Sequence, residues 1–181
     1  MMKNKGKVLL VTLGILLSGI AMSQSSVDNQ EVVEEASLAK QAILEKDPGL
    51  QEFFNDAYGY AILPTVGKGG FIIGGAAGKG VLYHGGEPVG LIKMTQVTVG
   101  AQIGGKSYIE VIFFNTEAEY TVFRSGRFEV SAQVAAIAVT AGVSQTMAYS
   151  DGIAILTMGR GGFMAEASVG GQKFSFKPFE E

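Results

Sequence analysis

A glycine-rich segment that occurs twice constrains the fold of this 181-residue chain more than any other feature. The first copy runs from Gly59 to Phe71 (GYAILPTVGKGGF) and the second from Gly152 to Phe163 (GIAILTMGRGGF). Both contain an A-I-L run, a threonine, a G-[KR]-G-G motif and a phenylalanine, and the first has one additional residue, Pro64. Short apolar runs beside glycine bends are typical of strands, and two copies are too few for a solenoid. The repeat therefore predicts two related halves of one sheet.

Strand-like runs continue between and after the two copies. They are VLYH, VGLIKMTQVTV, SYIEVIFF and KFSFKPF, and Gly85-Gly86 indicates a turn. One helix interrupts them, because Thr116 to Glu119 (TEAE) forms a capping box and Gly126 stands where a helix C-terminal glycine belongs. Residues 130–143 fit either a strand or a helix. We expect an α+β fold, mainly an antiparallel curved or barrel-like sheet, with N-terminal helices and one inserted helix.

The first 23 residues have the pattern of a secretory signal peptide. Lys3, Lys5 and Lys7 precede an uncharged apolar run at 8–21, and Ala21-Met22-Ser23 resembles a cleavage site. As a helix this run is about 21 Å long, which is short of a ~30 Å hydrocarbon core. An uncleaved membrane anchor is the alternative. We expect residues 1–23 to be removed and the protein to be exported to the periplasm or the cell exterior.

The pattern predicts a helical segment over residues 24–56, followed by a β-rich domain over 57–181. Residues 31–46 place apolar side chains on one helix face at Val32, Ala36, Ala39 and Ile43. Asp47-Pro48 then supplies an N-cap and a first-turn proline for a short second helix. We expect the apolar face to pack against the β-rich domain. A membrane-surface helix is the alternative, but such helices usually carry Lys or Arg on the polar face, and this one carries Glu.

Composition and charge exclude several classes of function. The chain has no Cys and one His, which removes disulfides, thiolate metal sites, Cys nucleophiles and multi-His metal sites. We expect no cofactor. Without Lys3, Lys5 and Lys7 the chain has 11 basic and 17 acidic residues, a net charge of −6. Nucleic-acid binding depends on neutralising phosphates, so this balance argues against a nucleic-acid partner.

Cations beside glycines are the candidate binding residues. Glycine permits positive φ, and successive exposed N–H groups next to a cation form an anion-binding nest. Lys68 and Arg160 lie in the two G-[KR]-G-G motifs, while Lys79, Lys106 and Lys173 lie in other glycine-rich segments. The pattern predicts bends that turn these cations toward one acceptor for an anion. Tight turns or bulges with solvent-facing cations are the alternative.

Two patterns resemble enzyme motifs, but neither is well supported by the surrounding sequence. Residues 100–107 (GAQIGGKS) match the P-loop pattern, but residues 108–114 (YIEVIFF) predict a strand where nucleotide binding needs a helix. A hydrolase could use His84, or a carboxylate pair drawn from Glu110, Glu129 and Glu166. The sequence has no G-x-S-x-G nucleophile-elbow motif, and the spacing of the three glutamates gives no support to a catalytic pair. We therefore expect no catalytic activity.

Residues 58–178 resemble the SYLF domain family, which includes a yeast actin-patch protein and many exported bacterial proteins. The resemblance rests, in order, on GYAILPTVGKGGFIIGGAAGKG, TQVTVGAQIGGKSY, IFFNTEAEYTVFRSGRFE and TMGRGGFMAEASVGGQKFSFKP. It implies a non-catalytic lipid-binding module. Eukaryotic members bind phosphoinositides, are fused to SH3 or FYVE domains, and can contact actin filaments.

The resemblance also implies how lipid would be bound. The five cations beside glycines would meet lipid headgroups, and the acyl part would contact Phe71, Phe163 or a cavity inside the sheet. The sequence contains no SH3 or FYVE segment, and its N-terminal helix is acidic. These departures argue against actin and phosphoinositides and favour an envelope lipid or another amphiphile. The alternative function is a structural or protein-interaction module of the cell envelope.

Overall fold

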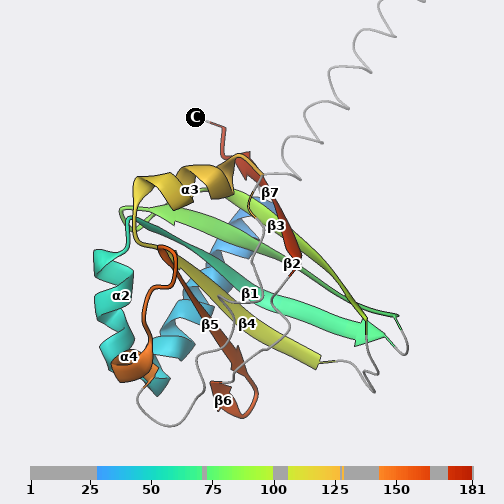
Figure 1. Cartoon of the computed structure of the whole chain (residues 1–181), viewed down its shortest axis with the longest axis horizontal. Coiled ribbons are helices and arrows are strands. Elements are labelled where there is room, and N and C mark those ends of the chain that lie inside the picture. The colour runs from blue at the N-terminus through green and yellow to red at the C-terminus, as the bar shows by residue number, and fades with distance from the viewer. Residues whose placement is uncertain are drawn as a thin grey trace, which may run out of the picture.

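The computed structural model describes residues 28–70, 73–99, 106–126, 128, 143–163 and 171–180. They form one antiparallel sheet of seven strands in the order β6-β5-β4-β1-β2-β3-β7 (Figure 1). The strands are β1 (Gly59–Gly70), β2 (Ile73–His84), β3 (Glu87–Val99), β4 (Lys106–Phe114), β5 (Ile153–Gly159), β6 (Gly162–Phe163) and β7 (Gln172–Pro178). The predicted α+β class with a mainly antiparallel sheet is confirmed. The sheet is open, with β6 and β7 as its edges, so barrel-like closure stays a prediction.

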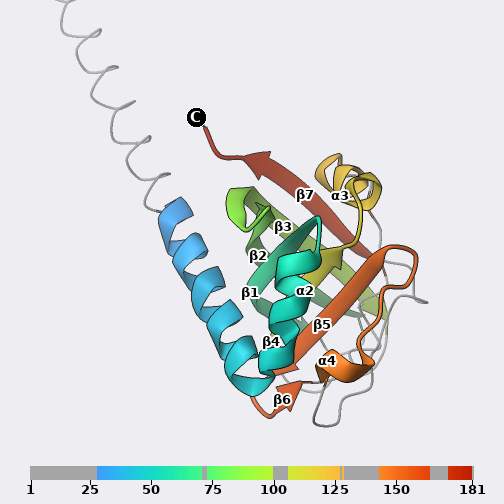
Figure 2. The ribbon, with the colours of Figure 1, turned by 90° about the vertical axis from the view of Figure 1, so that its left-hand side faces the viewer.

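Helices cover both faces of this sheet. A helix over residues 28–46, called the N-terminal helix below, crosses one face, and α3 (Glu117–Arg124) covers the other (Figure 2). A 3-10 turn η1 (Pro48–Leu50), α2 (Gln51–Asp56) and α4 (Val143–Thr146) complete the described helices. The N-terminal helix buries Ala36, Ala39 and Ile43, so the predicted packing face is confirmed. None of the described helices has the length and apolarity that crossing a membrane requires.

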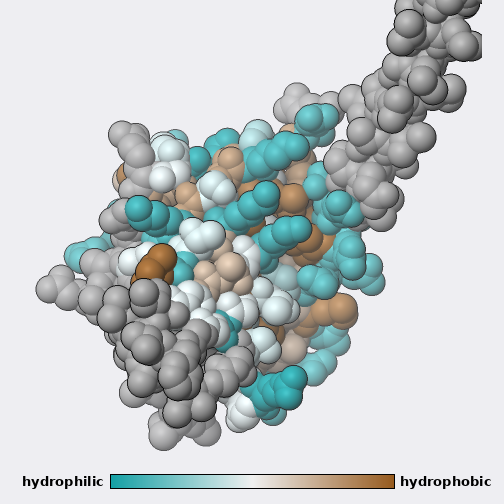
Figure 3. All heavy atoms as spheres, turned by 90° about the vertical axis from the view of Figure 1, so that its right-hand side faces the viewer, coloured by the Kyte–Doolittle hydropathy of each residue, from teal (hydrophilic) through white to brown (hydrophobic). Residues whose placement is uncertain are grey.

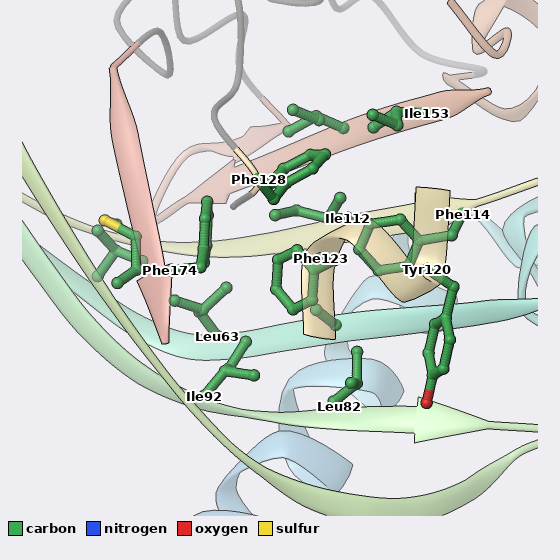
Figure 4. Close-up of a cluster of buried hydrophobic side chains, with 14 of the residues drawn as sticks. Leu63, Leu82, Ile92, Ile112, Phe114, Tyr120, Phe123, Phe128, Ile153 and Phe174 are labelled. Carbon is green, nitrogen blue, oxygen red and sulfur yellow. The ribbon is translucent and has the colours of Figure 1, made fainter. Parts of the chain in front are cut away.

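Each face of the sheet has its own apolar core. We call the face under the N-terminal helix the outer face and the face under α3 the inner face. On the outer face, residues of the N-terminal helix, α2 and α4 pack against Tyr60, Ile62, Val111 and Phe113. On the inner face, Phe123 of α3 and Phe174 of β7 point toward Leu63 and Ile92 (Figure 4). Because side chains alternate along a strand, adjacent residues of one strand serve different cores.

Lys40 fixes the N-terminal helix to the outer core. Its Nζ donates to the Tyr60 hydroxyl at 3.1 Å and lies 4.5 Å from the centroid of the Phe54 ring. Tyr60 in turn stacks on Tyr83, with ring centroids 4.8 Å apart. Burial, together with the nearby Tyr60, raises the pKa of Tyr83 to about 12. Tyr83 is therefore neutral at physiological pH and behaves as a core aromatic residue.

Asp47 links the N-terminal helical segment to α4. Its carboxylate accepts a hydrogen bond from Gly49 N at 3.0 Å, which confirms the predicted cap. It also accepts from the backbone N and the Oγ of Ser144, both at 2.9 Å. The backbone hydrogen bond from Ser144 holds the pKa of Asp47 below its usual value, although burial acts in the opposite direction. The cap therefore doubles as a long-range connection that local sequence patterns do not reveal.

The predicted turn and inserted helix are confirmed. Gly85 and Gly86 have φ values of 58° and 87° in the β2–β3 turn. Thr116 caps α3 by accepting from Ala118 N at 3.2 Å, and Gly126 follows the helix with a φ of 70°. The ambiguous residues 130–143 lie outside the described residues, except for Val143, which begins α4.

The G-K-G-G motif of the first repeat is not a bend, so our prediction of an anion-binding nest there was wrong. β1 continues through Gly67 to Gly70, and these residues pair with residues 77 to 74 of β2. Gly67 and Lys68 also pair with β4, and none of these glycines has a positive φ. The backbone is engaged in the sheet instead of facing a ligand. The second motif does turn, because Arg160 and Gly161 connect β5 to β6.

The two repeats form strands β1 and β5, which flank β4. Phe114 of β4 pairs with Gly59 on one side and with Ile153 on the other. The aligned residues nevertheless point to different cores, since Ala61 lies in the inner core and Ala154 in the outer one. The copies are thus two neighbours of one central strand, and not two halves of the sheet as predicted.

Gly80 occupies a place where β1 and β2 approach too closely for a side chain. A Cβ at Gly80 would collide with the carbonyl oxygen of Ile62, beside the register shift between Ile62 and Thr65. We expect Gly80→Ala to lower the free energy of unfolding by about 1–3 kcal/mol, because the neighbouring backbone cannot move without breaking the ladder. Gly69→Ala is the control, since nothing lies within 4 Å of a Cβ there. Denaturant unfolding of both variants tests this, and equal losses would contradict it.

Candidate functional site

The structure separates the five predicted cations into three places. Lys68 and Lys106 are register partners on β1 and β4, at positions of the inner face. Lys79 on β2 and Lys173 on β7 occupy positions of the outer face, where both side chains are exposed. Arg160 is exposed in the β5–β6 turn. The sheet therefore does not bring all five cations to one anion-binding spot.

The outer face of β2, β3 and β7 carries four exposed lysines, which we call the lysine face: Lys79, Lys93, Lys173 and Lys177. Lys79 and Lys93 are direct register partners. Lys93 also pairs with Ser175, so Lys173 and Lys177 lie two residues to either side of that partner on β7. Directly opposite Cβ atoms are about 4.5–5.5 Å apart and diagonal neighbours about 7–8 Å apart. Four positive charges thus share a small area.

The surroundings of these lysines consist of small or weakly polar side chains. The exposed neighbours on the same face include Thr65, Gly67, Ala77 and Thr95, and Val97 is 76% exposed. On the side of the molecule seen in Figure 3, hydrophilic residues and apolar residues are interspersed among pale ones of intermediate hydropathy. The N-terminal helix packs over Val81 and the outer core, so the lysine face begins where this cover ends. A partner can therefore reach these four exposed lysines.

Charge on the lysine face is not balanced within its strands. β2, β3 and β7 contain these four lysines and one acidic residue, Glu87, at the start of β3. Like charges placed directly opposite each other in a sheet destabilise it, so the Lys79–Lys93 pair costs folding free energy. A chain with a net charge of −3 thus concentrates positive charge in one place. An anion that settles there offsets the repulsion.

Our sequence reasoning missed Lys93 and Lys177. It selected cations next to glycines, whereas these two lysines stand next to Ile92 and Phe176. The available signal was the period of two, in which Lys173, Ser175 and Lys177 alternate with side chains of the inner face. Which strands lie side by side was the missing information.

A second polar group lies on the inner face. Five residues are successive register partners across β4, β1, β2, β3 and β7, and we call them the inner polar row: Lys106, Lys68, Ala76, Gln96 and Gln172. The adjacent row belongs to the inner apolar core, except for one glycine, and consists of Tyr108, Val66, Gly78, Met94 and Phe174. Among the described residues, the inner polar row borders this core, and Ala76 belongs to both.

Gln172 is held in this row by a buried carboxylate. Its Nε2 donates to Oε2 of Glu110 at 2.9 Å, and both residues are 0% exposed. Glu110 lies on β4 and Gln172 on β7, with three strands between them in the sheet. The bond therefore joins two strands that are not neighbours in the sheet. Gln96, the register partner of Gln172, is only 4% exposed.

The structure describes two of the four residues considered for a hydrolase, His84 and Glu110. His84 is exposed, and its Nδ1 lies 3.0 Å from the carbonyl oxygen of Tyr58, so this nitrogen carries the proton. Glu129 and Glu166 lie outside the described residues. The described part of the chain places no three His, Asp or Glu side chains where they could hold a metal ion. Lys106 begins a strand, which confirms that the P-loop match lacks its helix.

Of the two phenylalanines predicted to contact the acyl part of a lipid, one lies among the described residues. Phe71 lies outside the described residues, and Phe163 is half-buried against the outer core, so it is not an exposed apolar anchor. An open groove of about 420 Å³ runs between the N-terminal helix and Phe179, with Val33 in its lining. This groove is on the surface and not inside the sheet.

Comparison with known proteins finds a distant relative and no family. No family model matches the chain. The protein is 28% identical over 135 residues to Beta cell expansion factor A of Aeromonas veronii, a match that covers 73% of this chain and 51% of the relative. The chain thus spans about half the length of that protein.

We expect one substitution on the lysine face to raise stability. Lys93→Thr removes the repulsion with Lys79 and should add about 0.2–1 kcal/mol to the free energy of unfolding at low salt. Lys177→Thr is the matched control, because it makes the same change on an exposed strand position whose partner is Leu91. Denaturant unfolding at low and high salt separates repulsion from strand propensity. A gain at position 93 that equals the control, or that persists in high salt, would contradict the account.

Proposed function

We propose that this chain is a non-catalytic lipid-binding protein of the SYLF type, and that the lysine face binds anionic lipid surfaces. One observation carries the proposal, namely the opposed pair Lys79 and Lys93 with Lys173 and Lys177 beside it on an exposed face. The four lysines repel one another, and an anionic partner that neutralises them would remove this repulsion. The proposal includes export, so the partner is a lipid of the cell envelope or a similar amphiphile.

Electrostatics supply enough free energy for such binding. A basic residue close to an anionic membrane contributes about 1 kcal/mol, so four act together at the level of several kcal/mol. The register of β2, β3 and β7 brings all four charges to neighbouring positions on one face. Salt screens this attraction beyond about one Debye length, ~8 Å at physiological salt, and the acidic residues of the N-terminal helix weaken it further at longer range.

The distribution of apolar residues favours this function over a protein-docking module. Among the described residues the exposed large hydrophobic side chains are Leu38, Val97 and Val122, which lie on three different elements. Protein-interaction sites more often show a contiguous apolar patch. The described surface offers clustered cations in its place. The structural or protein-interaction module remains the second candidate.

The proposal also includes a barrel-like curl of the sheet. The bond between Gln172 and Glu110 supports it, because it joins the inner faces of β7 and β4 across three intervening strands. Such a curl turns the lysine face outward and the inner polar row inward.

Vesicle co-sedimentation tests the lipid proposal. We expect the protein to pellet with phosphatidylglycerol vesicles and not with phosphatidylcholine vesicles, and to be released by high salt. Lys79→Ala/Lys93→Ala should weaken binding about tenfold or more, given about 1 kcal/mol per lysine. Lys46→Ala/Arg124→Gln removes the same charge from exposed helical positions and serves as the control. Equal pelleting with both lipids, or equal losses in both variants, would overturn the proposal.

A further inference from the structure

The lysine face has a counterpart of opposite charge on the same chain. Five exposed residues follow one side of the N-terminal helix, and we call them the acidic stripe: Glu31, Glu34, Glu35, Leu38 and Glu45. Their spacing places them on the side of the helix opposite the buried Ala36 and Ile43. We infer that the acidic stripe of one copy docks on the lysine face of a second copy, which gives a two-fold symmetric dimer. This inference goes beyond lipid binding and does not depend on it.

The charges of the two surfaces complement each other. The acidic stripe carries four carboxylates, and the lysine face carries four ammonium groups. Lys40 of the same helix points to the sheet, where its Nζ donates to the Tyr60 hydroxyl at 3.1 Å. The acidic stripe points away from the sheet, so it cannot reach the lysine face of its own copy. A second copy related by a two-fold axis supplies the missing partner for both surfaces at once.

Each surface also holds an exposed apolar side chain. Leu38 lies within the acidic stripe and is 59% exposed, and Val97 of the outer face is 76% exposed. Among the described residues the large hydrophobic side chains with such exposure are these two and Val122. Docking of the stripe on the lysine face therefore covers the two most exposed of them, inside a rim of charged residues, as is usual for an interface.

A groove beside the N-terminal helix gives the second helix a place to lie. Phe179, two residues beyond Lys177 along the chain, lines one part of it together with Val33. A second part of about 430 Å³ continues along the helix and has Leu44 in its lining. Ser37 lines both parts, so the groove follows the helix. The two-fold arrangement sets the helices of the two copies side by side across this groove, between the two sheets.

The contact has the size of a weak specific dimer. The N-terminal helix over residues 28–46 is about 28 Å long. A strip about 10 Å wide along it, made twice and counted on both partners, buries about 1,100 Å². Specific interfaces begin near this area. Because the contact is mainly electrostatic, we expect a dimer with a micromolar dissociation constant at low salt that separates at high salt.

Sedimentation velocity without lipid tests the dimer. The unmodified protein should be dimeric at low salt. Glu31→Lys/Glu34→Lys and Lys79→Glu/Lys93→Glu should each raise the dissociation constant at least tenfold, because like charges then oppose each other at both contacts. An equimolar mixture of the two variants should restore the dimer, since the reversed stripe meets the reversed face and the unmodified stripe meets the unmodified face.

Controls separate docking from general effects of charge and folding. Glu52→Lys/Glu117→Lys reverses two exposed charges on α2 and α3 and should remain dimeric. Leu38→Lys changes an exposed residue outside both cores and should also weaken the dimer at least tenfold, while Val122→Lys on α3 should not. A monomeric unmodified protein, a dimer that survives the reversals, or a mixture of folded variants that stays monomeric would each overturn the inference.

Failure of the dimer and failure of the lipid proposal give different results. Both partners use the lysine face, so phosphatidylglycerol vesicles should compete with the second copy. A protein that is monomeric at every salt concentration and pellets with these vesicles overturns the dimer alone. A salt-sensitive dimer that never pellets supports the dimer and overturns the lipid proposal alone.

Discussion

Alternation of side chains along antiparallel strands governs this molecule, because both faces of the sheet are covered over part of its length. Val81 serves the outer core while its neighbour Leu82 serves the inner one. Where the N-terminal helix no longer covers the outer face, the same alternation exposes Lys79. Beside the inner apolar core, it places Lys68 and Gln96 in one row. The lysine face therefore arises where the cover of the outer face ends, from strands whose other residues are structural.

The glycines make this arrangement possible. Side chains at Gly80 and Gly90 would collide with backbone atoms of neighbouring strands, so these residues let the strands approach closely. Elsewhere glycine and alanine keep the side chains of the outer face small, as at Gly67 and its register partner Ala77. Small side chains leave the lysines of this face accessible, while close strand approach suits a curled sheet. One composition thus serves two physical purposes.

Local sequence patterns predicted much of the fold. They did not predict the features that depend on which strands pair with each other. The face of the N-terminal helix, the cap at Asp47 and the turn at Gly85 each depend on nearby residues, and all were predicted. Lys68 was assigned to a bend because glycine allows both turn and extended conformations, and only pairing with β2 and β4 decides between them. Lys93 joins the site only through its register with Lys79, which spacing along the chain does not encode.

Whether the lysine face contacts lipid can be measured directly, because the chain contains no cysteine. Ala77→Cys places one label among the exposed residues of this face, and Asn55→Cys places one on α2. With a polarity-sensitive fluorophore, the account predicts that phosphatidylglycerol vesicles shift the emission of the label at position 77 to the blue and shield it from an aqueous quencher. The label at position 55 should stay unchanged. Equal responses at both positions, or a response at position 55 alone, would contradict the account.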